Sequence, residues 1–160
     1  MAKTTKKKEK SGDGLLSHLV EMPGIVEKDE AAEFLDDLLT EAREAKCTRL
    51  SRVGAKGKPA DFLKGALEGS PWLRGLLTGD APMAERVLFS DPDEHLAVLS
   101  AAVRAEVKAA EERAGVMELL RRYKNEAASL VALSDLAGVW TVDRVIAAMT
   151  EIADTAVSAS

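Results

Sequence analysis

The sequence has few of the residues that small proteins use for covalent or metal chemistry. Only one of its 160 residues is a cysteine, so no disulfide can form within the chain. A lone thiol fits a reducing cytoplasm, which is the location that we expect. Cys47 and the two histidines, His18 and His95, are scattered without the spacing of metal ligands. We therefore predict no metal-ligating residue and no Cys–His catalytic pair.

Long apolar runs are also missing. No stretch approaches the roughly 18 residues needed to span a bilayer. The N-terminal lysines have no apolar segment behind them, unlike a secretory signal. Aromatic residues make up 4% of the chain, so a core must depend on leucine, valine and alanine. With 46% hydrophobic and 31% charged residues, the composition indicates one globular domain without a membrane partner.

Charge is unevenly divided along the chain. Residues 1–13 hold five lysines and two acids, whereas the remainder has 17 basic and 25 acidic residues. An acidic body does not attract the anionic nucleic-acid backbone, so we expect no nucleic-acid partner. Residues 1–14 are expected to form a disordered Lys-rich tail, and residues 15–160 a helical domain. The alternative is a basic arm, Lys6–Lys8, for an acidic partner.

The body of the chain predicts helices only. Apolar residues recur at three-to-four spacing, and the alternation of a strand never persists. The expected helices lie at 27–45, 60–69, 71–79, 82–89, 93–114, 116–137 and from 142 onward. The last of them is expected to carry one apolar stripe, made of Val142, Val145, Ile146, Met149, Ile152 and Val157. We therefore expect an all-α bundle of about five to seven helices.

Capping residues separate these helices. Ser70 and Asp91 each precede a proline, which suits an N-cap followed by the first helical position. Gly138 suits a left-handed helix stop, and Thr141 a new N-cap. Trp72 is expected to be a core anchor, with a ligand-stacking ring as the alternative.

Two segments resemble catalytic or phosphate-binding motifs. Asp91 and Asp93 have the Asp-x-Asp spacing that nucleotidyltransferases use to hold Mg²⁺, but Pro92 between them cannot pair within a central strand. Helix capping is the interpretation that we favour. The glycine-rich basic loop 48–60 lacks the spacing of a phosphate-binding loop and has no strand before it, which favours a linker.

The best candidate contact is a cluster of three cations, Arg121, Arg122 and Lys124. Glu118 and Glu126 bracket it at helix-neighbour spacing, so local ion pairs on a solvated face are one interpretation. A partner or domain contact is the other, because adjacent arginines suit carboxylate or phosphate recognition.

The same region carries a family resemblance. "MELLRRYKNEAASLVALSDLAGVWTVDRVIAAMTEIADTAVSAS" resembles the segment before the first catalytic domain of glutamine synthetase adenylyltransferases, especially those of alphaproteobacteria. "SPWLRGLLTGDAPMAERVLFSDP" is similar to the amino-terminal helical region of that family. The matching positions are Leu120, Arg121, Arg122, Tyr123, Lys124, Asp135, Leu136, Gly138 and Trp140.

The resemblance implies a bifunctional parent enzyme. Members of this family attach AMP to glutamine synthetase and remove it, using ATP and Mg²⁺ under control of glutamine and a P-II signalling protein. Their glycine-rich Ser-Asp-x-Asp signature is not found in these 160 residues. No catalytic or cofactor-binding residue of the family therefore carries over to a position here.

Two hypotheses follow from the sequence. The first is an amino-terminal helical fragment of an adenylyltransferase, inactive alone, whose last helices pack on a missing catalytic domain. It predicts exposed apolar residues on the final helix, at Ile152 and Val157. The second is a free-standing, non-enzymatic helical interaction module. A nucleic-acid binder using Lys6–Lys8 and the Arg121–Arg122 face is a weaker third.

Overall fold

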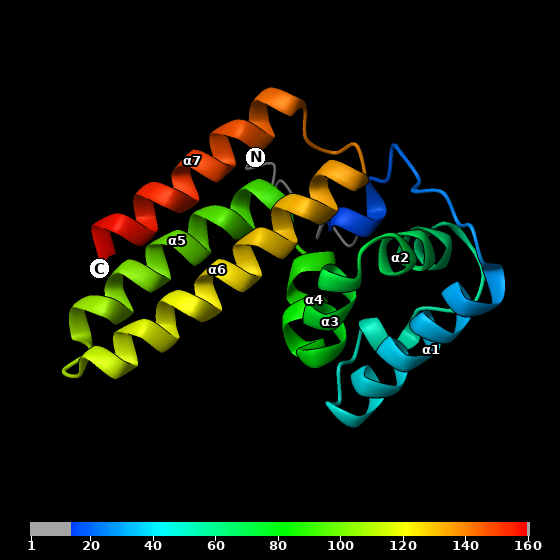
Figure 1. Cartoon of the computed structure of the whole chain (residues 1–160), viewed down its shortest axis with the longest axis horizontal. Coiled ribbons are helices and arrows are strands. Elements are labelled where there is room, and N and C mark those ends of the chain that lie inside the picture. The colour runs from blue at the N-terminus through cyan, green and yellow to red at the C-terminus, as the bar shows by residue number, and fades with distance from the viewer. Residues whose placement is uncertain (1–13, 160) are drawn as a thin grey trace, which may run out of the picture.

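The computed structural model describes residues 14–159, and these are helical throughout apart from short connections (Figure 1). They form seven α-helices and two short 3₁₀-helices. The 3₁₀-helices are η1 (Leu15–Ser17) and η2 (Leu50–Arg52). The α-helices are α1 (Lys28–Glu44), α2 (Lys58–Gly69), α3 (Pro71–Gly79), α4 (Ala81–Leu88), α5 (Pro92–Ala109), α6 (Arg113–Leu136) and α7 (Val142–Ala159). The all-α prediction is confirmed.

The expected tail, residues 1–14, lies outside the described residues except for Gly14. That residue is buried against Phe89, so that a Cβ at position 14 would stand 2.7 Å from the Phe89 backbone. The lysine arm Lys6–Lys8 also lies outside the described part of the chain.

Helix boundaries follow the predicted caps. The Ser70 side chain accepts a hydrogen bond from the Leu73 amide at 3.2 Å, and Asp91 accepts one from the Glu94 amide at 2.9 Å. Gly138 has a φ of 64°, the left-handed conformation expected of a helix stop. The Thr141 hydroxyl then caps α7. Local signals therefore account for the starts of α3, α5 and α7 and for the end of α6.

The helices pack in two groups joined by α6 (Figure 1). Helices α5, α6 and α7 contact one another in a three-helix bundle, and α1 to α4 form the other group. Helix α6 packs against α3 and α4 as well as against its two bundle partners. This places the cation cluster on the helix that connects both groups.

The core consists mainly of aliphatic side chains, as the shortage of aromatics predicts. Phe62 is its one fully buried ring among the described residues, and the largest buried side chains are otherwise leucines. The prediction that Trp72 anchors the core is wrong, because 53% of its surface is exposed. Leu73 and Leu77, which follow on α3, are fully buried instead. A helix this short buries one side only, and Trp72 lies outside that side.

The last helix divides its apolar residues between two faces, whereas the sequence predicts one stripe. Val145 and Ile152 pack on the core, while Val142, Ile146 and Met149 face outward. The prediction of an exposed apolar residue therefore holds for Val157, which is 76% exposed. It is wrong for Ile152, which is partly buried against the core.

Candidate functional site

The three predicted contact residues all lie on the surface of α6. Arg121 forms an ion pair with Glu118, three residues earlier on the same helix. Arg122 and Lys124 are exposed, and their side chains make no hydrogen bond or ion pair with another residue of the described chain. The interpretation as local ion pairs thus holds for Arg121 and leaves two cations available to a partner.

The expected pair between Arg122 and Glu126 does not form. Glu126 instead turns toward α4 and α5, where Arg86 and His95 bind it. The Arg86 guanidinium donates to both carboxylate oxygens, with Nε to Oε1 at 3.0 Å and Nη2 to Oε2 at 2.7 Å. The His95 Nε2 lies 2.9 Å from Oε1. The three residues bring together helices α4, α5 and α6.

Burial and hydrogen bonding act in opposite directions on the Glu126 carboxyl. Its side chain is 10% exposed, and burial alone would raise its pKa. The hydrogen bonds with His95 and Arg86, together with the charge of Arg86, outweigh burial and lower the pKa of Glu126 to about 2. The carboxylate is therefore ionised at neutral pH and serves as the charged centre of this cluster.

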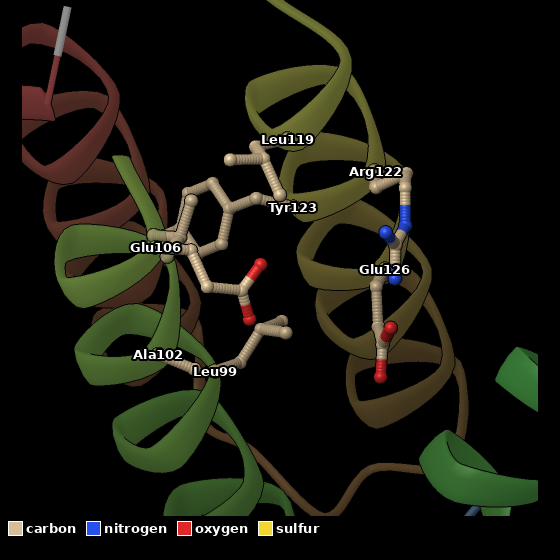
Figure 2. A pocket seen from close by; sticks show the side chains of 8 residues that line it. Leu99, Ala102, Glu106, Leu119, Arg122, Tyr123 and Glu126 are labelled. Atoms are coloured by element: carbon tan, nitrogen blue, oxygen red, sulfur yellow. The ribbon is translucent and has the colours of Figure 1, made fainter. Parts of the chain in front are cut away.

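A shallow groove runs beside this cluster between α5 and α6. Its main hollow measures about 270 Å³. The residues that line this hollow are Arg86, His95, Val98, Leu99, Ala102, Arg122 and Glu126. A smaller hollow of about 60 Å³ adjoins it on the Tyr123 side. Figure 2 shows the smaller hollow, with Arg122 and Glu126 on α6 and Tyr123 directed toward α5. The groove joins apolar side chains to the free guanidinium of Arg122.

Polar bonds hold the inner side of α7 against α5. Arg104 donates to the Thr155 hydroxyl at 2.7 Å, and Arg144 donates to Asp93 at 2.6 Å. The Ser100 hydroxyl lies 3.3 Å from a Glu151 oxygen, inside the three-helix bundle. These bonds fix which face of α7 points outward.

The outward face of α7 carries an apolar stripe, defined here as Val142, Ile146 and Met149. The three residues are 71%, 58% and 60% exposed. Their spacing of four and three residues puts them on one side of a helix. Singly exposed apolar residues are ordinary, but three aligned on one helix make this face a candidate interaction surface.

Asp91 is the N-cap that the capping interpretation expects, and Asp93 lies in the first turn of α5. Asp91 caps α5, and the Asp93 carboxylate accepts a hydrogen bond from Arg144 on α7. The two acids lie at a helix start and not on a strand. Within residues 14–159, no group of three or more histidine, cysteine or acidic side chains is placed to hold a metal ion.

Within residues 14–159, the remaining reactive side chains form no hydrogen bond with one another. Cys47 is buried, and burial raises the pKa of its thiol, with further contributions from the charges of Glu85 and Asp80. The His18 ring bonds to the Gly14 carbonyl at 3.1 Å, whereas the His95 ring bonds to Glu126. None of the described helices is both long and apolar enough to cross a bilayer.

Comparison with known proteins identifies the family. A family model for glutamate-ammonia ligase adenylyltransferase matches residues 63–160. The chain is 42% identical over 146 residues to the bifunctional glutamine synthetase adenylyltransferase/adenylyl-removing enzyme of Bradyrhizobium sp. (strain BTAi1), covering 91% of this chain and 15% of that protein. The enzyme of the same name from Bradyrhizobium diazoefficiens is 39% identical over 152 residues, which cover 95% of this chain and 15% of that enzyme.

A third relative matches a shorter segment. The enzyme of the same name from Xanthobacter autotrophicus is 43% identical over 96 residues, which cover 60% of this chain and 10% of that enzyme. No solved structure matches the chain. The chain spans about 15% of the length of the two Bradyrhizobium relatives. With the family model matching more than half of its residues, the chain belongs to the glutamine synthetase adenylyltransferase family.

Proposed function

We propose that this chain is a helical docking unit of a glutamine synthetase adenylyltransferase, without nucleotidyl transfer of its own. The observation that carries the proposal is the apolar stripe of α7, Val142, Ile146 and Met149, held outward by polar bonds on the opposite face. Its occupant is the remainder of the adenylyltransferase. In the Bradyrhizobium relatives most of the polypeptide lies outside the segment matched here.

The bonds of the Asp91–Asp93 pair support the proposed absence of nucleotidyl transfer. One carboxylate of this pair satisfies a helix N-terminus, and the other binds Arg144 on α7. A nucleotidyltransferase needs both free to ligate Mg²⁺. The transfer of AMP, with ATP and Mg²⁺, is accordingly assigned to the rest of the parent enzyme.

The partners of the parent enzyme follow from the family. Glutamine synthetase would be its substrate in the cytoplasm, and a P-II protein its regulator. The contribution of this chain is to support the catalytic part through α7, with Arg122 and Lys124 as cations for carboxylates on the facing surface.

An AMP-transfer assay tests the absence of turnover. The 160-residue chain, given ATP, Mg²⁺ and glutamine synthetase, is expected to transfer no AMP above background. Measurable transfer that is lost in Asp91→Asn or Asp93→Asn would overturn the capping interpretation of those two acids.

Substitution in a whole enzyme tests the docking role. The segment of the Bradyrhizobium BTAi1 enzyme that matches this chain is replaced by the chain itself, and Ile146→Asp is introduced. The charge would be buried in the domain contact, so we expect a lower melting temperature of the whole enzyme. The matched control is Met117→Asp, at another exposed apolar residue that lies outside both the stripe and the groove.

The isolated chain separates docking from local damage. Both variants should leave its melting temperature close to that of the unsubstituted chain, because both residues are exposed there. Equal effects of the two variants in the whole enzyme would reject the stripe as the contact. In that case the chain would act as a free-standing interaction module, or dock through another face.

A further inference from the structure

A separate hollow lies where η1 meets the basic loop, on residues that take no part in the α7 stripe. It measures about 320 Å³. Its lining residues are Leu16, Ser17, Arg49, Arg52, Val53, Gly54, Lys56, Pro59 and Phe89. This is within the size range of small-molecule sites in proteins.

The lining of this hollow is positively charged in an otherwise acidic chain. Arg49, Arg52 and Lys56 border it, and none of its lining residues is acidic. The sequence from Lys46 to Ala60 holds five cations and no acid, although the whole chain carries a net charge of −5. Neighbouring cations repel one another, so such a cluster favours a bound anion.

The first of these cations is fixed in position. The Arg49 Nη1 donates to the Phe89 carbonyl at 3.1 Å, and the guanidinium lies 4.7 Å from the centre of the Phe89 ring. The Glu85 carboxylate anchors the loop by accepting the backbone amides of Arg49 at 2.8 Å and Leu50 at 2.7 Å. A positioned guanidinium loses little conformational freedom when it binds a ligand.

The other two cations are available. The side chains of Arg52 and Lys56 make no hydrogen bond or ion pair with another residue of the described chain. The loop between them is held at its end, because Lys64 donates to the Ala55 carbonyl at 2.7 Å. Gly57, with a φ of 100°, makes the turn into α2. The free donors therefore lie on an anchored loop.

We propose that this hollow binds the phosphate group of a small phosphorylated molecule. Arg49, Arg52 and Lys56 would hold the phosphate oxygens, because guanidinium groups present paired donors that match oxyanions. The apolar side chains of Leu16 and Val53 would contact the rest of the ligand. The recognition differs from that of a phosphate-binding loop, since side chains and not successive backbone amides supply the donors.

A small molecule fits these observations better than a nucleic acid. The hollow is a single pocket, and nucleic-acid binders spread their cations over a long basic surface. The remainder of this chain is acidic and would repel an extended phosphate backbone. Charge and size thus both restrict the ligand.

The test is a titration followed by ¹H–¹⁵N NMR on the 160-residue chain. The probes are phenyl phosphate, inorganic phosphate and phenol. Phenyl phosphate is expected to shift the amide signals of Val53, Gly54 and Lys56 in a saturable way, and phenol is not. Saturation by inorganic phosphate at the same concentration would support the phosphate site and identify free phosphate as sufficient.

Matched variants locate the interaction. Arg52→Gln removes a free, exposed cation of the hollow and is expected to weaken phenyl phosphate binding about tenfold. Lys108→Gln, at an exposed lysine of α5, should leave the affinity for phenyl phosphate unchanged. Equal weakening in both variants, no saturable shift, or equal shifts with phenol would overturn the proposal. Tighter binding of a single-stranded oligonucleotide at these amides would replace it with a nucleic-acid surface.

Discussion

The bound carboxylate of Glu126 gives the sharpest test of how the helices are held together. Glu126→Gln keeps the shape of the side chain and removes its charge. A pKa lowered from an ordinary 4.5 to about 2 corresponds to roughly 3 kcal/mol of stabilisation, at about 1.4 kcal/mol for each tenfold change in proton affinity. The Arg86 side chain is 50% exposed, so solvent screens part of this. We expect Glu126→Gln to lower the free energy of unfolding by about 2 kcal/mol at pH 7.

The sign of the pH dependence follows from the lowered pKa. An ionised Glu126 stabilises the fold fully above its ordinary pKa of 4.5, and this contribution disappears as the pH falls through about 2. Urea denaturation of the wild-type chain and the Glu126→Gln variant, from pH 7 to pH 3, is the assay. The difference in the free energy of unfolding between these two chains should narrow as the pH falls below 4.5.

An exposed acid on the same helix provides the control. Glu118→Gln removes the partner of Arg121 on a solvated face, where an ion pair contributes at most about 0.5 kcal/mol. If Glu126→Gln costs no more than Glu118→Gln, or if its cost is the same at pH 7 and pH 3, the assigned role of the carboxylate is refuted.

Three further predictions concern the core and the buried thiol. Gly65→Ala places a Cβ 2.5 Å from the Pro23 carbonyl oxygen and should cost about 1–3 kcal/mol in urea denaturation. Gly75→Ala, in helix α3 with nothing within 4 Å, should instead add about 0.5–1 kcal/mol, and equal effects would reject the close contact. Phe62→Ala should cost about 3–5 kcal/mol by the same measurement, and a loss below about 1 kcal/mol would contradict its full burial. Cys47 should react with a thiol reagent far more slowly in the native chain than in urea, and equal rates would contradict its burial and raised pKa.

Local signals in the sequence account for most of the secondary structure. Caps such as Ser70 and Asp91 satisfy amides within the next three residues, so their effect is visible in a short window. Gly138 marks its stop through its own backbone conformation. The exposure of Trp72 could not be predicted in this way, because tertiary packing decides which side of a short helix faces the core.

The candidate site depended more heavily on long-range contacts. The pair of Arg121 with Glu118 lies within one helix and follows from spacing. Glu126 binds Arg86, 40 residues away, and not Arg122, four residues away. Which of these two arginines it binds depends on how α4 packs against α6. The two faces of α7 likewise follow from polar bonds to α5 that no local pattern contains. The sequence holds no local signal for the Glu126 cluster, because its members come from three separate helices.

The docking role of α7 is tested most directly by the reactivity of Met149. Hydroxyl-radical footprinting compares the isolated chain with the chimaeric Bradyrhizobium enzyme that carries it. Met149 and Met117 are 60% and 55% exposed in the chain, so both should oxidise readily there. In the whole enzyme we expect Met149 to be protected from oxidation. Met117, near the start of α6, should be protected much less. Unchanged oxidation of Met149 in the whole enzyme would contradict the proposal that α7 packs against the rest of the adenylyltransferase.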